Sequence, residues 1–164
     1  MPPATEPIPV LILDNLATAL RGINGGTDYY HTVTGVEYAR DLIREEYPGG
    51  YPAIFIGEPG QVGDTDQPAD TGVMWHGTWH WHVPVFGVIR DVGGGTESYR
   101  ALLRFVADIY RAVVQDYQRG QMAYSTEVLG WTMVGPQEET DGRPWVAVTV
   151  RIKFNTKDTN MVSQ

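Results

Sequence analysis

The sequence predicts an α+β fold: a mainly antiparallel sheet with an N-terminal helix and a long helix packed on one face. Three observations predict this class. Residues 144–154 alternate apolar and polar side chains with the two-residue period of a half-buried strand. Residues 96–118 carry apolar side chains at helical spacing. Residues 123–134 predict another strand, and the acidic, glycine-containing residues 135–143 indicate a hairpin between the last two strands.

The first part of the chain predicts a helix and strand pieces. Residues 1–8 are rich in proline and are expected to be an extended lead-in. Residues 9–21 predict a helix, with proline tolerated in its first turn and glycine beyond its end. Residues 28–40 contain good strand formers, and Gly35 is expected to mark a bulge or a break between two pieces. Residues 41–46 predict a short helical turn.

The middle of the chain predicts two strands separated by a long loop. Residues 51–57 are expected to form a strand buried on both faces, because three bulky apolar residues follow one another there. Residues 58–72 predict a loop, long enough to be either functional or disordered. Residues 73–91 predict a long strand, bent near Pro84 and Gly87. Proline there favours an edge position or a bulge.

The long helix is expected to begin with Thr96 as its N-cap and to end before Gly120. Its apolar side chains are expected to form one stripe: Tyr99, Leu102, Leu103, Val106, Ile109, Tyr110, Val113, Val114 and Tyr117. Residues 155–164 read as a polar tail. The whole chain, residues 1–164, is expected to be a single domain, because no internal repeat or second domain is visible.

Composition excludes several classes of function. The chain of 164 residues has a formal net charge of -8 and twelve Lys and Arg residues, so it is a poor candidate for gripping nucleic acid. It contains no cysteine, which excludes disulfides, thiolate catalysis and Cys-ligated zinc. The apolar run at residues 8–13 is too short to span a membrane and lacks the basic leader of a signal peptide.

A cluster of tryptophan and histidine at residues 75–82 is the sharpest candidate for chemistry. On a strand, alternate residues share a face, so the histidines and the tryptophans separate. The two groups are His76, His80 and His82 on one face, and Trp75, Trp79 and Trp81 on the other. Histidines at i and i+2 can reach one metal ion, but zinc needs further ligands, and the glutamate that the cupin pattern places after such a pair is missing. The tryptophans could stack on a sugar or a nucleobase, or pack in the core or between subunits; packing is preferred.

Other candidate sites have weaker support. The glycines at 93–95 precede a helix and could hold phosphate, but no Walker lysine follows, so a hinge is preferred. No Gly-x-Ser-x-Gly occurs, and the paired glutamates at 45–46 and 138–139 read as solvated acids. The sequence therefore assigns no catalytic, cofactor-binding or metal-binding residue, and we expect a protein that is not an enzyme.

The order of these segments resembles the tail terminator (tail-tube completion) proteins of long-tailed bacteriophages. Residues 10–20 match the family's first helix, and residues 51–56, Tyr-Pro-Ala-Ile-Phe-Ile, resemble its aromatic-Pro-Ala-hydrophobic strand. Residues 78–86 resemble the following strand, and residues 99–117 correspond to the long helix. The end of the chain resembles the family's closing hairpin, through Gly130-Trp131, the acidic turn and residues 145–150. The resemblance covers residues 10–154 and is one of layout and hydrophobic texture.

The resemblance implies a homo-oligomer, a hexameric ring that caps the tail tube, stops its polymerisation and joins it to the head connector. The implied partners are the tail tube protein and the neck protein. The implied location is the tail or neck of the virion, after assembly in the host cytoplasm. No membrane partner and no tight nucleic-acid binding are expected, although DNA passes through such a ring. The alternatives are another neck or tail virion protein, such as a tube or head-completion protein, and a small metal- or sugar-binding module that uses the Trp/His strand.

Overall fold

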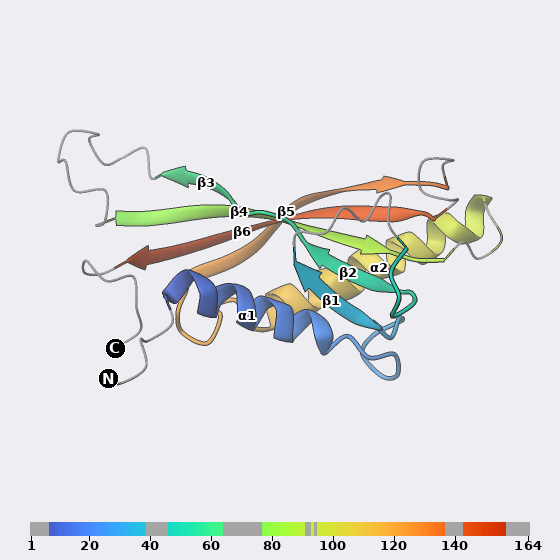
Figure 1. Ribbon diagram of the computed structural model, residues 1–164, viewed down its shortest axis with the longest axis horizontal. Helices are drawn as coiled ribbons and strands as arrows, with labels where there is room; N and C mark the ends of the chain where they lie inside the picture. Colours follow the sequence, from blue (N-terminus) through green and yellow to red (C-terminus); the bar gives the residue numbers. More distant parts are fainter. Residues whose placement is uncertain are drawn as a thin grey trace.

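The computed structural model describes residues 7–38, 46–63, 77–90, 93, 95–136 and 143–156. They form one sheet with two helices on one face, which confirms the α+β expectation (Figure 1). The strand order is β1-β2-β4-β6-β5, and β3 also pairs with β4. The strand bounds are β1 Gly35–Tyr38, β2 Ala53–Ile56, β3 Gly60–Gly63, β4 Gly77–Val88, β5 Ser125–Val134 and β6 Trp145–Thr156. All pairings are antiparallel except that of β1 with β2.

Both helices cover the same face of the sheet. Helix α1, Ile8–Arg21, contacts β1, whereas α2, Gly95–Gln115, contacts β5 and β6. The two helices also pack against each other, so each covers one half of the sheet (Figure 1). Helix α1 begins one residue earlier than predicted, with proline in its first turn.

The main core lies between the sheet and the helices. Strand β6 supplies five side chains to it at alternate positions, as its two-residue period predicts: Val146, Val148, Val150, Ile152 and Phe154. Each is at most 1% exposed. Burial of such a side chain stabilises the fold by about 1.5–3 kcal/mol, so this strand anchors the core.

Strand β2 is buried on both faces, as predicted. Ile54 and Ile56 join the main core, whereas Ala53 and Phe55 point to the opposite face. There they form a second, smaller cluster with Val88, against which Tyr47, Tyr51, Phe86 and Trp145 pack. The face of the sheet that the helices leave open is therefore covered near β2.

The predicted loop at residues 58–72 is wrong in part, because residues 60–63 form β3. This strand pairs with the first half of β4. Residues 64–76, the remainder of that loop and the predicted start of the next strand, lie outside the described residues. On the left of Figure 1, the ends of β4 and β6 extend past the end of α1.

The expected edge position of Pro84 is also wrong, because β4 lies inside the sheet. Its neighbour on one side changes from β3 to β2 at this point, and the backbone amide of Gly57 donates to the carbonyl of Pro84. The amide and carbonyl of one strand residue point the same way, so the missing N–H of Pro84 faces the interruption between β2 and β3. The ladder tolerates proline because the break lies in the neighbouring strand.

Several predicted element bounds differ from the structure. Of the described residues 28–38, only Gly35–Tyr38 form a strand, and Gly35 begins it instead of breaking it. Helix α2 begins at Gly95, so Thr96 lies in its first turn and is not the N-cap, and it ends at Gln115. Strand β6 continues through Thr156, two residues into the predicted tail. The short helical turn expected at 41–46 lies outside the described residues, apart from Glu46. Most of the extended lead-in, the hairpin tip and the rest of the tail also lie outside them.

The single apolar stripe predicted for α2 is wrong, because it divides into a buried part and an exposed part. Leu102, Val106, Ile109 and Val113 are buried, together with Phe105 and Ala112. Tyr99, Leu103, Tyr110 and Tyr117 are exposed. The apolar arc of the helix is therefore wider than the surface that the sheet and α1 cover.

Gly87 allows α2 to approach β4 closely. A Cβ at this position would lie 2.5 Å from Cε1 of Phe105, whose side chain is fully buried. We expect Gly87→Ala to lower the free energy of unfolding by about 1–3 kcal/mol, measured by urea denaturation, because the buried ring has no space to move away.

Gly130→Ala on β5 is the matched control for this substitution. No atom lies within 4 Å of a Cβ built there, so its unfolding free energy is expected to stay within about 0.5 kcal/mol of wild type. Equal values for the two variants would contradict the close packing of α2 on β4.

Candidate functional site

The Trp/His strand separates its side chains as predicted. Trp79 and Trp81 face the helices and pack against the main core, and the ring of Trp81 meets Phe154 edge-on at 4.8 Å. His80 and His82 lie on the open face of the sheet, opposite Lys153 and Arg151 of β6. Trp75 and His76 lie outside the described residues. Packing therefore accounts for the two described tryptophans.

The open face near His80 and His82 carries mixed charge. Arg151 donates to Glu127 of β5 at 2.6 Å, and this hydrogen bond holds the pKa of Glu127 below its usual value. Within the part of the chain that the structure describes, no three His, Cys, Asp or Glu side chains are grouped to hold a metal ion. The two histidines thus have basic cross-strand neighbours, a poor setting for binding a cation.

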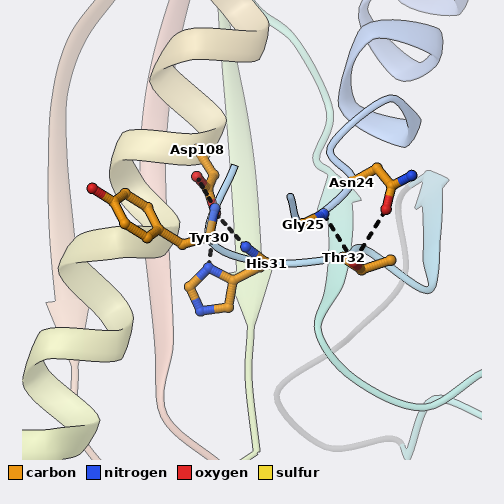
Figure 2. A network of polar contacts seen from close by, with 6 residues as sticks. All are labelled: Asn24, Gly25, Tyr30, His31, Thr32 and Asp108. Carbon is orange, nitrogen blue, oxygen red and sulfur yellow. Dashed lines mark hydrogen bonds and ion pairs between the residues drawn. The ribbon is translucent and has the colours of Figure 1, made fainter. Parts of the chain in front are cut away.

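Asp108 of α2 holds the connection between α1 and β1 (Figure 2). Its side chain is 0% exposed. The carboxylate accepts hydrogen bonds from the backbone amides of Tyr30 and His31, and contacts Nδ1 of His31 at 2.8 Å. The His31 ring also lies 5.0 Å from that of Phe105. The carboxylate fixes a loop that is 77 residues away in sequence.

A second hydrogen bond orders the same loop. The backbone amide of Gly25 donates to Oγ1 of Thr32 at 2.9 Å, and that hydroxyl contacts Asn24 (Figure 2). The carboxylate of Asp108 already has hydrogen-bonding partners in the amides of Tyr30 and His31 and in the His31 ring. The pair of Asp108 and His31 is therefore best explained as a structural clamp that holds this loop. Sequence reasoning missed it, because Asp108 lies on the polar side of the predicted stripe and its partners are mostly backbone amides.

Arg119 is a second buried group that ties elements together. Its side chain is fully buried and donates to the carbonyl of Val113, to Thr126 on β5 and to Asn15 on α1. Burial lowers the pKa of Arg119, although Asp116 opposes this shift. The guanidinium joins the end of α2, β5 and α1, so it fixes α2 beside β5.

A surface of exposed aromatic side chains runs along α2 and β5. We call it the α2–β5 edge. Its members are Tyr99, Leu103 and Tyr110 on α2, Tyr117 just after α2, Tyr124 just before β5, and Leu129 and Trp131 on β5. With 3.6 residues per turn, the three α2 side chains point within about 40° of one another. Trp131 is 53% exposed and Tyr99 is 54% exposed, which is unusual for side chains of this size.

The two parts of the α2–β5 edge meet at a shallow pocket of about 360 Å³. Tyr99 and Leu102 of α2 line one side, and Trp131 and Met133 of β5 line the other. Sequence reasoning placed the three α2 members and Tyr117 in one apolar stripe with the buried side chains, because helical spacing predicts an apolar face without saying what covers it.

The two edges of the sheet differ in their protection. At the β1 edge, Tyr38 donates to the carbonyl of Leu13 at 3.1 Å, and Arg21 contacts the carbonyl of Val36 at 3.5 Å. Burial, and then the nearby Asp14, raise the pKa of Tyr38 to about 12. Among the described residues, β5 pairs only with β6, so one side of its ten-residue backbone has no strand partner there.

No family model matches the chain, and no curated protein matches it. Neither helix among the described residues is long and apolar enough to cross a membrane.

We expect Asp108→Ala to lower the free energy of unfolding by about 3 kcal/mol, measured by urea denaturation. The substitution leaves the amides of Tyr30 and His31 without their buried acceptor. Asp28→Ala, an exposed acid in the same loop, is the control and is expected within about 0.5 kcal/mol of wild type. An Asp108→Ala variant as stable as this control would show that the clamp is not needed.

Proposed function

We propose that this chain is a tail terminator of a long-tailed bacteriophage. It assembles into a ring that caps the tail tube, stops tube polymerisation and joins the tube to the head connector. Its site of action is the neck or tail of the virion, after assembly in the host cytoplasm. It works by contact between matching surfaces and not by making or breaking bonds.

The observation that carries the proposal is the α2–β5 edge. Five of its seven members lie on α2 and β5, beside a strand edge that lacks a partner in the described part of the chain. Water-exposed aromatic side chains gathered in one place are typical of protein–protein contact surfaces. A chain that acts by assembly needs such a surface.

The order of elements also supports the proposal. The resemblance implies a first helix, a buried strand, a long strand, a long helix and a closing hairpin. The chain has α1, β2, β4, α2 and the β5–β6 pair in that order. The net charge of -8 suits a ring through which DNA passes, since an acidic surface does not retain phosphate.

Electron microscopy of virions made without this protein tests the proposal. We expect tails of uncontrolled length, or tails without heads, because nothing stops the tube or offers a surface to the connector. Supplying the wild-type chain from a plasmid is the control and is expected to restore tails of uniform length attached to heads. Normal tails joined to heads in its absence would refute the role.

A further inference from the structure

We propose that the open face of the sheet carries a proton-dependent binding site for a phosphate-like oxyanion, formed by His80 and His82 of β4 and Lys153 of β6. We call these three residues the β4–β6 basic cluster. The site goes beyond the proposed function, and it gives a role to three basic side chains that neither the core nor the helices use.

The strand register brings the three side chains of the cluster around one point. His80 lies directly opposite Lys153 in the ladder of β4 with β6, and His82 follows two residues later on the same face. Directly opposite side chains have Cβ atoms about 4.5–5.5 Å apart, and residues i and i+2 of one strand lie about 6.5 Å apart. The three side chains are half-buried, so their polar ends can reach a single small ion above the sheet.

The cluster has no anionic partner in the described part of the chain. Among these residues, none of its three side chains takes part in an ion pair or a side-chain hydrogen bond. The carboxylate of Glu127 lies nearby, but it accepts hydrogen bonds from Arg151, which is opposite His82, and from Ser125. Strand β3 places no charged residue opposite the histidines. The positive charge of the cluster is therefore left for a ligand to neutralise.

The arrangement of donors fits an oxyanion with several oxygens. A carboxylate presents two oxygens in one plane, which suit one forked guanidinium, whereas phosphate presents oxygens in four directions to separate donors. Lysine contributes a fixed charge, and histidine is the side chain that gains its charge between about pH 8 and pH 5. Protonation of both histidines adds two positive charges to the site, so binding strengthens as the pH falls.

Isothermal titration calorimetry of the full chain with sulfate at constant ionic strength tests the site. Sulfate has the shape of phosphate, and its own charge does not change over this range of pH. We expect binding at least about tenfold tighter at about pH 6 than at about pH 8, because two more positive charges then act within a few ångströms of the ion. Absence of binding at about pH 6, or equal affinity at the two pH values, would overturn the inference.

Inorganic phosphate and glycerol phosphate, compared at about pH 6, distinguish the source of the phosphate group. Binding of both assigns a phosphate ester or free phosphate to an open site, and binding of the inorganic ion alone assigns free phosphate. Both results support the site, whereas binding of neither would count against it.

Substitutions within the cluster separate its members. Lys153→Gln is expected to weaken sulfate binding at least about tenfold at both pH values, because the fixed charge is lost. His80→Gln/His82→Gln is expected to remove the dependence on pH. Arg90→Gln is the matched control, since it removes the same charge from an exposed side chain just beyond the end of β4, and it is expected to bind like the wild type. An equal loss in the Arg90 and Lys153 variants would overturn the inference.

Glu127→Gln gives a result that a purely structural effect would not produce. Arg151 and, more weakly, His80 lower the pKa of Glu127, so its carboxylate is charged and opposes a bound anion. We expect this variant to bind sulfate at least about threefold more tightly than the wild type. Unchanged or weaker binding would contradict the site.

Circular dichroism checks that each variant is folded. Glu127 is exposed, so its variant decides the matter if a substitution in the cluster disturbs folding. Failure of these binding tests leaves the proposed function standing, because tail length in virions tests that role separately.

Discussion

The antiparallel ladder between β4 and β6 is the interaction on which the rest of the structure depends. Twelve residues of each strand pair without interruption, from Gly77 with Thr156 to Val88 with Trp145. The ladder presents a continuous apolar row on one face, and this row is stable only when it is covered. Helices α1 and α2 provide the cover, and Gly87 allows α2 to approach closely. The shorter strands β2, β3 and β5 add to the two sides of this ladder.

The same arrangement explains why one edge remains exposed. The cover that α2 provides uses only part of its apolar arc, so Tyr99, Leu103 and Tyr110 remain outside the core. Tyr38 and Arg21 tie β1 and α1 together at the other end of the sheet, whereas β5 keeps an open side among the described residues. A fold with one closed edge and one open aromatic edge is suited to directional assembly. This difference connects the fold to the role that we propose.

The sequence predicted those features that depend on local periodicity. The alternation in β6, the burial of β2 on both faces and the opposite faces of Trp81 and His82 all follow from the geometry of an extended chain. Strand β3 was missed, because two of its four residues are glycines and its pairing is set by β4. The clamp at Asp108 was missed because its partners lie far away in sequence. The exposed flank of α2 was not separated from the buried part of the predicted stripe, because a core and a contact surface use the same residue types and spacing.

Hydrogen–deuterium exchange of the full chain over a range of protein concentrations tests the central claim most directly. Backbone amides on the open side of β5 exchange quickly in a single copy and slowly when a second copy covers them. The account predicts that exchange in Ser125–Val134 slows as the concentration rises and the particle mass increases. Exchange in this strand that stays constant while the mass increases would contradict it, because assembly would then use another surface.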